Sequence, residues 1–168
     1  TPSVPIEIGF LDTEGNSWNI DIINNLIYLA DRSGGLRIID ISNPLTPLEL
    51  GFYNTGGDVW CVEIIDNYAY MAVGGGGLNI IDISIPSSPV DVGNCNTVGN
   101  AYSIAVNGNY AYVADGNGGL RIIDITTPSS PSEVGFCSTG GMAYGVAVNE
   151  NYAYIADWYG GLRIIDVS

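Results

Sequence analysis

The segment Gly34-Gly35-Leu36-Arg37-Ile38-Ile39-Asp40 decides the fold, because it returns three times at a constant spacing of 42 residues. The later copies lie at residues 76–82, 118–124 and 160–166, and they differ from the first only by Asn in place of Arg in the second copy. A strict period of this length is typical of a repeat architecture. Residues that occur in every period are therefore expected to serve the repeat.

Each period contains four segments with the composition of β-strands, and the third period shows them well. Residues 102–106, 110–114, 120–125 and 132–137 are rich in Val, Ile and Tyr, and Gly, Pro and Asn separate them. The Asn-Gly pair between the first two segments is a strong hairpin signal. No segment has a helical period with caps. We therefore expect an all-β chain of four-stranded units.

The third strand of each unit lacks a clean alternation of apolar and polar residues. Adjacent Ile122 and Ile123 point to opposite faces of a strand, so both faces of the sheet must be covered. Four-stranded sheets of about 42 residues that cover one another are the blades of a β-propeller. A β-solenoid is the alternative, although its coils are usually shorter and lack three tight hairpins per period.

The four units are expected to form one domain, residues 1–168. The chain does not begin at the first strand of a unit or end at the fourth. Residues 1–13 hold a fourth-strand segment without three strands before it, and the repeats follow at about 14–55, 56–97, 98–139 and 140–168. The last repeat ends after its third strand, so we predict that an N-terminal strand completes it. An unpaired edge invites such pairing. The donor is the same chain in a four-bladed ring, a second chain in an eight-bladed ring, or a neighbour in a longer chain or polymer.

The apolar cores at 36–40, 78–82, 120–124 and 162–166 resemble the core of the LVIVD repeat. The flanking Asn-Tyr-Ala-Tyr-Val-Ala-Asp at 109–115 and the Pro-x-x-Pro that follows the core are similar to the flanks of that repeat. The resemblance covers the whole chain, although Arg or Asn replaces the first Val of the motif. It implies propeller blades in a bacterial or archaeal surface or secreted protein, and it supplies no catalytic residue.

Composition excludes several classes of partner. There are 18 acidic residues, four Arg and neither Lys nor His, which gives a net charge of −14. Nucleic acids and anionic membrane surfaces require clustered cations, and no apolar run is long enough to insert in a membrane. An acidic, Lys-free surface rich in Asn, Ser, Thr and Gly predicts an extracellular or cell-surface location. The sequence has neither a signal-peptide pattern nor an initiator Met, so we expect a processed form or part of a longer product.

Catalysis has little support in the sequence. Without His or Lys, the commonest general base and the Schiff-base nucleophile are absent. Asp21 and Glu63 share one position in successive first strands and are the candidate carboxylate pair for glycoside hydrolysis, but we interpret them as the lining of the channel. The loop 115–119 partly resembles a Ca²⁺ loop and lacks the further carboxylates that such a site needs. We predict no enzyme, cofactor or metal site, with Ca²⁺ as the one candidate ion.

The repeated charged residues are interpreted as structural. The Asp that closes each core is expected to accept backbone N–H bonds from the following turn. An ion pair is expected across the second hairpin of units one, three and four, between Arg37, Arg121 and Arg163 and Asp31, Asp115 and Asp157. Unit two has lost both partners together, with Val73 and Asn79 in their places, as a pair predicts.

The three cysteines do not suggest a disulfide framework. Cys95 and Cys137 occupy one repeat position in neighbouring units, and their Cα atoms should lie beyond the roughly 7 Å limit for a bridge. We interpret these two and Cys61 as small buried hydrophobic residues, with an intermolecular bridge as the alternative.

Two groups of residues are candidate functional sites. Trp158 and Tyr159 replace small polar residues of the equivalent loops and predict a subunit contact beside the incomplete blade, together with Pro5, Ile6 and Ile8 of the N-terminal strand. A repeated aromatic position either packs between blades or forms a ligand face at the channel mouth, at Trp18, Trp60, Tyr102 and Tyr144.

We accordingly predict a non-catalytic structural and interaction module that assembles by β-strand complementation into a closed ring or a filament. The alternative is a carbohydrate- or peptide-binding propeller that uses the aromatic residues of the channel mouth.

Overall fold

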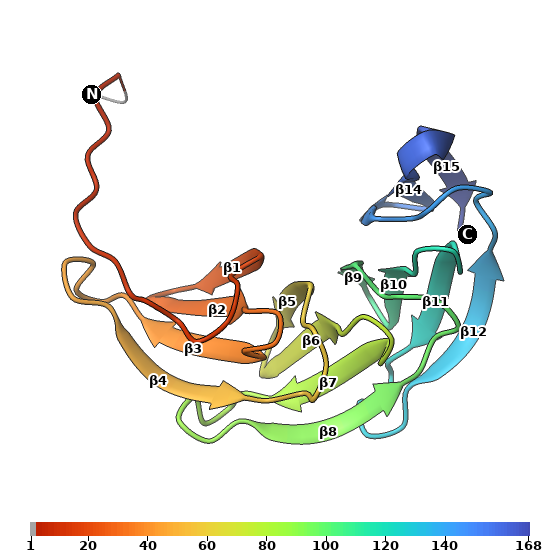
Figure 1. Cartoon of the computed structure of the whole chain (residues 1–168). Coiled ribbons are helices and arrows are strands. Elements are labelled where there is room, and N and C mark those ends of the chain that lie inside the picture. Colours follow the sequence, from red (N-terminus) through yellow and green to blue (C-terminus); the bar gives the residue numbers. More distant parts are fainter. Residues whose placement is uncertain (1–2) are drawn as a thin grey trace.

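The computed structural model describes residues 3–168, which form an arc of four antiparallel sheets (Figure 1). The first sheet contains β1 (Asn19–Ile23), β2 (Leu26–Ala30), β3 (Leu36–Asp40) and β4 (Leu48–Tyr53). The second contains β5 (Cys61–Ile65), β6 (Tyr68–Ala72), β7 (Leu78–Asp82) and β8 (Val90–Cys95). The third contains β9 (Ser103–Asn107), β10 (Tyr110–Ala114), β11 (Leu120–Asp124) and β12 (Ser132–Cys137).

The fourth sheet has three strands, β13 (Gly145–Asn149), β14 (Tyr152–Ala156) and β15 (Leu162–Asp166). A single 3-10 turn, η1 (Trp158–Gly160), connects the last two of them. No helical segment in the described part of the chain has the length and apolarity that a membrane crossing requires. The predicted all-β fold of sheets about 42 residues apart is confirmed. Every sheet is built from consecutive strands of one unit, which is the order of propeller blades and not of solenoid coils.

The first strands of neighbouring sheets lie side by side along the inner side of the arc, where β1 contacts β5, β5 contacts β9 and β9 contacts β13. The fourth strands β4, β8 and β12 lie along its outer rim (Figure 1). Successive blades therefore have the same orientation, and each presents one face to the blade before it and the other to the blade after it.

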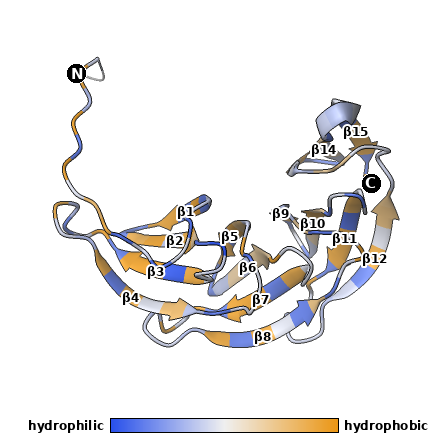
Figure 2. Ribbon diagram, in the orientation of Figure 1, coloured by the Kyte–Doolittle hydropathy of each residue, from blue (hydrophilic) through white to orange (hydrophobic). Residues whose placement is uncertain are grey.

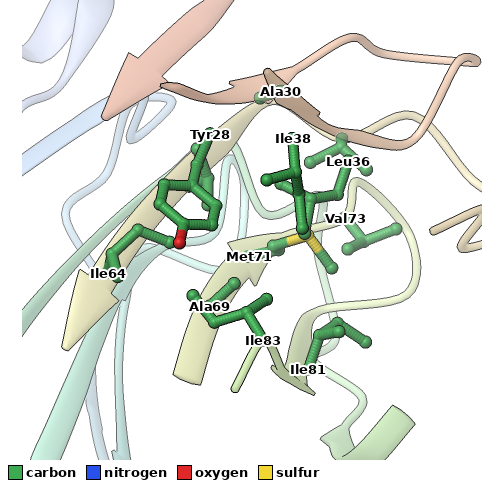
Figure 3. Close-up of a cluster of buried hydrophobic side chains, with 12 residues drawn as sticks. Tyr28, Ala30, Leu36, Ile38, Ile64, Ala69, Met71, Val73, Ile81 and Ile83 are labelled. Atoms are coloured by element: carbon green, nitrogen blue, oxygen red, sulfur yellow. The ribbon is translucent and has the colours of Figure 1, made fainter. Parts of the chain in front are cut away.

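The hydrophobic core lies between the sheets and not within any one of them. Between the first two sheets, Leu36 and Ile38 pack against Met71 and Ile81, and all four are fully buried (Figure 3). Two further clusters repeat this arrangement between the second and third sheets and between the third and fourth. The expectation that each sheet is covered on both faces is met for the two inner sheets.

The N-terminal segment differs from its prediction. Residues 5–13 form no strand, and the segment extends from the first sheet, at the end of the arc opposite to β15 (Figure 1). The predicted pairing of this segment with the last blade, in a ring closed by one chain, is therefore not formed in this structure. The physical reason is that a strand needs a partner edge, and the edge predicted for this segment, that of β15, lies at the opposite end of the arc.

A buried ion pair organises the passage from one blade to the next. The Asp115 carboxylate is fully buried, accepts hydrogen bonds from the Thr97 hydroxyl and the Gly99 N–H, and lies 3.4 Å from Nε of Arg121. Burial raises the pKa of Asp115, while these hydrogen bonds and the Arg121 charge oppose the rise. Units one and four repeat the pair with Asp31–Arg37 and Asp157–Arg163, so the predicted cross-strand pairing is confirmed.

The Asp that ends each third strand has the expected capping role. Asp40 accepts a bond from the Ser42 N–H, which lowers the pKa of the Asp40 carboxyl. Equivalent bonds fix the turns after β7, β11 and β15. The chain is thereby guided into the Pro-containing turn that leads to the outer strand.

Removing both partners of the buried pair should destabilise the protein by less than the sum of the two single removals. In Asp115→Val, Arg121 loses its buried counter-charge, and we expect the free energy of unfolding to fall by about 3 kcal/mol. Asp115→Val/Arg121→Asn copies the residues of unit two, so a coupling energy of about 1–2 kcal/mol should reduce its loss. Urea denaturation of the two single variants and the double variant measures this coupling, and strictly additive losses would show that the pair is not coupled.

Candidate functional site

The two ends of the arc expose apolar sheet faces that are buried everywhere else. On the first sheet, Ile20 and Ile22 are half exposed, whereas Val62 and Ile64 at the same positions of the second sheet are buried. On the fourth sheet, Leu162 and Ile164 are 68% and 61% exposed, whereas Leu36 and Ile38 in the first are fully buried. Figure 2 shows that apolar residues continue along the strands at both ends of the arc.

These two faces are the two halves of one repeated interface. At each internal contact, one blade contributes the positions of Tyr28, Leu36 and Ile38, and the next contributes the positions of Val62, Ile64 and Met71. The fourth sheet carries the first half of this set with Leu162 and Ile164, which are exposed, and Tyr154, which is partly buried. The first sheet exposes the second half with Ile20, Ile22 and Leu29, of which Leu29 is partly buried. The two ends of the arc thus carry the two complementary sets of apolar positions that form each internal contact.

The edge of β15 lacks a fourth strand, and its residues remain arranged for one. At the second glycine of each Gly-Gly pair, the backbone has a positive φ, and at Gly35 and Gly119 the carbonyl oxygen that ends the fourth strand leaves no room for a Cβ. Gly161 keeps this conformation with φ 72°, yet its surroundings are empty. Beside it a groove of about 350 Å³ follows β15.

Arg163 lacks two of the contacts that the equivalent arginines make. The Arg121 guanidinium lies 3.2 Å from Glu133 and 5.0 Å from the ring centroid of Phe136, both on the fourth strand β12. Arg37 contacts Glu49 and Phe52 on β4 in the same way. The side chain of Arg163 keeps only Asp157 among the described residues and is 46% exposed, against 6% and 10% for Arg37 and Arg121.

The N-terminal segment carries the residues that Arg163 lacks. Glu7 and Phe10 stand at the repeat positions of Glu133 and Phe136. The segment also lies where a fourth strand of a preceding blade would lie, because Gly9 abuts the Pro44 carbonyl as Gly51 abuts that of Pro86. Between the segment and the first sheet is an apolar groove of about 400 Å³, lined in part by Ile8, Phe10, Ile20 and Leu29.

A continuous row of aromatic rings crosses the four blades of the arc. The predicted aromatic residues are brought together, with ring centroids 5.1 Å apart for Trp18–Trp60, 5.2 Å for Trp60–Tyr102 and 4.5 Å for Tyr102–Tyr144. The row continues through Trp158, 4.8 Å from Tyr144, to Tyr159. Both roles predicted for these rings fit the structure. Trp18 is 62% exposed to solvent, while the next three rings are partly covered by neighbouring blades.

Trp158 also occupies the position at which each of the first three blades forms a backbone bridge to the next blade. Gly74 exchanges two hydrogen bonds with Ala101, and Gly116 does the same with Ala143. Within residues 3–168 Trp158 makes no such bridge, and the residue that would match it by repeat position is Ser17 at the other end of the arc. Trp158 and Tyr159 therefore lie at the open end, beside the incomplete blade. Of the other predicted interface residues, Ile6 and Ile8 are exposed on the N-terminal segment, and so is Pro5.

The candidate carboxylate pair has a structural role. Asp21 accepts a bond from the Ile64 N–H, and Glu63 accepts one from the Val106 N–H, so each ties a first strand to the next blade. Burial raises the pKa of Glu63, the bond from Val106 opposes the rise and the Asp21 charge adds to it. The sequence does not predict these cross-blade bonds. A carboxylate on an inner strand gives the same sequence pattern whether it faces water or the backbone of the next blade.

The remaining sequence candidates do not form a reactive centre. Asp115 of the glycine-rich loop points inward to Thr97 and Arg121. Among residues 3–168, no three Asp, Glu, His or Cys side chains are close enough together to hold a metal ion. Cys61, Cys95 and Cys137 are partly buried free thiols that pack against the inter-sheet clusters, and burial raises the pKa of Cys61 and Cys95.

Solved structures with the same fold include two designed proteins and one natural protein. The computationally designed Ika4 protein has a TM-score of 0.77 at 14% identity, over 98% of this chain and 100% of its own. The computationally designed Ika8 protein has a TM-score of 0.70 at 14% identity, over 90% of this chain and 46% of its own. A functionally unknown protein from Desulfotomaculum acetoxidans DSM 771 has a TM-score of 0.78 at 18% identity, over 90% of this chain and 55% of its own. The chain thus spans about half the length of the last two.

Sequence comparison adds the family. No curated protein is significantly similar to the chain. The LVIVD repeat model matches residues 14–55, 56–97, 98–139 and 140–168, which is nearly the whole chain and agrees with the resemblance of its four apolar cores. The chain therefore belongs to the LVIVD-repeat family.

Proposed function

We propose that this chain is a non-catalytic interaction module that joins a second copy of itself by strand complementation, and that two copies close into one ring. The single observation that carries the proposal is the match between the two ends of the arc. One end exposes an edge and a face without a fourth strand, and the other holds a strand-like segment beside the complementary face.

The energetics favour covering both ends. Burying an exposed Leu or Ile side chain contributes about 1.5–3 kcal/mol, and the two end faces expose several such residues. Their combined burial is comparable with the whole stability of a typical domain, about 5–15 kcal/mol. Exposed apolar faces of this kind usually mark association surfaces.

Register and charge support the pairing in detail. In the third blade, Arg121 pairs in register with Phe136 and Ile123 with Glu133. The same register would place Arg163 opposite Phe10 and Ile165 opposite Glu7, which would complete the contacts that Arg163 lacks. Leu162 and Ile164 would then enter the groove beside Ile20 and Leu29 of the partner copy.

The shape of the arc favours a second copy over closure within one chain. The two ends lie far apart in Figure 1, and three equivalent interfaces set the turn from each blade to the next. Closing four blades on themselves would require every interface to open, whereas a second arc completes the ring with the same interface. Two solved structures of this fold are about twice as long as the arc.

The proposal places the module outside the cell or on its surface. The support is its composition, with a net charge of −14 and no Lys, and the absence of a reactive centre among the described residues fits a role in binding.

The aromatic row supports a second candidate function, the binding of a carbohydrate or peptide at the channel mouth, because exposed rings in a row offer a stacking surface.

Removal of residues 1–11 should abolish association. This truncation deletes Glu7 and Phe10 but keeps Thr13, whose hydroxyl bonds to Asp31. We expect the full chain to have twice its mass of 17.7 kDa in light scattering and the truncated chain to be monomeric or to aggregate. A full chain of single mass would overturn the proposal, and a mass that grows with concentration would indicate a filament in place of a ring.

Glu7→Arg should weaken association through repulsion from Arg163. Because like charges at a buried contact cost several kcal/mol, we expect at least about a tenfold increase in the dissociation constant, measured by sedimentation velocity. Glu150→Arg is the matched control, since it changes the net charge equally on an exposed turn. Equal effects of the two changes would show that net charge, and not this pair, controls association.

A further inference from the structure

The second blade departs from the repeat at positions that surround one pocket. Asn79 and Asn94 stand where blades one and three have Arg and Phe, and Val73 stands where the other three blades have the buried Asp. Gly56 and Gly74 stand where the first blade has Glu14 and Arg32. Large side chains are replaced by small ones together, and the space between them is a pocket of about 570 Å³. Ligand pockets in proteins measure about 300–1,000 Å³.

In the other complete blades this space is filled. Arg37 pairs in register with Phe52 and its guanidinium lies 5.1 Å from the ring, and Arg121 repeats the arrangement with Phe136. In the second blade the same register pairs Asn79 with Asn94. Two amides therefore face the pocket at the positions where a cation and a ring close it elsewhere.

The pocket offers hydrogen-bonding groups that the protein does not use. The side chains of Asn79 and Asn100 make no hydrogen bond within residues 3–168, and Asn94 makes only a long one, 3.4 Å, to Asn96. Each amide supplies two donors and an acceptor. Such mixed groups match hydroxyl groups, which also donate and accept.

An aromatic wall borders these amides. The rings of Trp60 and Tyr102 lie 5.2 Å apart at 75°, and both line the pocket. Any side chain at Gly74 would lie against Nε1 of Trp60, so the glycine keeps that edge of the indole open. The C–H groups of a sugar ring carry partial positive charge and pack well on the electron-rich faces of such rings.

The charges favour a neutral ligand. Asp58 is the single charged residue of the lining, and its Oδ2 lies 2.8 Å from Nη2 of Arg32, which neutralises it. No Arg or Lys lines the pocket to hold a phosphate, sulfate or carboxylate, because Arg32 pairs with Asp58 and lies over the Trp60 ring, 4.2 Å from its centroid. The net charge of −14 also repels anions.

We propose that the second blade binds a neutral carbohydrate of one or two sugar rings in this pocket. The inference is independent of assembly, and it deepens the second candidate function above by assigning the blade and the ligand class. The amides hold the hydroxyl groups, and Trp60 and Tyr102 pack against the sugar ring.

The test is a panel of immobilised neutral oligosaccharides, with sialylated and sulfated glycans as the anionic arm, followed by titration calorimetry of the best ligand. Asn79→Arg/Asn94→Phe restores the residues of blades one and three, so it should fill the pocket. We expect binding at least tenfold weaker, measured where the variant is folded, with an unchanged particle mass. Its thermal midpoint should fall, because the introduced arginine lies beside Val73 and not beside an Asp. Asn100→Met copies Met142 of the fourth blade, removes one amide from an exposed position, and should weaken binding severalfold.

Trp18→Ala separates the pocket from the aromatic row, because Trp18 belongs to the row and does not line the pocket. We expect Trp18→Ala to bind as the unaltered chain does. The proposal is wrong if no neutral glycan binds, if anionic glycans bind better, or if the pocket-filling double variant binds normally. Loss of binding in Trp18→Ala alone would assign the ligand to the row. None of these results depends on particle mass, so assembly stands or fails separately.

Discussion

Every sheet of this protein is apolar on both faces, and the rest of the structure follows from that constraint. A sheet with one apolar face can be covered by a single neighbour, but one with two needs a neighbour on each side. The second sheet satisfies this need with Leu78 and Ile80 on one face and Met71 and Ile81 on the other, all fully buried. Because the same interface is repeated, the stack has no natural end, and its two terminal faces remain uncovered.

The polar groups control how the blades meet. A buried carboxylate on one blade takes hydrogen bonds from the segment that arrives from the preceding blade, as Asp115 does from Thr97 and Gly99. Farther in, Asp21 and Glu63 accept backbone bonds from the next blade. Hydrogen bonds depend on direction, whereas apolar contacts tolerate sliding. The apolar faces therefore drive stacking, and the polar contacts fix the angle between blades.

The sequence predicts the interior of one blade better than the relation between blades. Strand limits in the third unit agree within one residue, and the Asp–Arg pairs were expected because unit two lost Asp and Arg together. The place of residues 5–13 was not predictable, since a strand-like pattern does not specify which edge it will join. The angle between successive blades is set by packing at their interfaces. The sequence does not reveal this angle, because the repeat period is the same whatever the number of blades in the ring. The pocket is likewise not predicted from the sequence, because Asn79 indicates only the loss of the Asp–Arg ion pair and nothing connects it with Asn94.

Assembly and ligand binding make different demands on the same repeat, and the second blade shows how both can be met. Its apolar faces keep the pattern of its neighbours, while Asn79 and Asn94 replace the Arg and Phe of blades one and three at the rim of the pocket. A ring of two copies would carry two such pockets, four blades apart and related by the symmetry axis. If the proposed pocket binds a neutral sugar weakly, two such sites on one ring would bind a surface of repeated glycans with avidity far above the single affinity. Association would then be the means by which a weak pocket becomes an effective one.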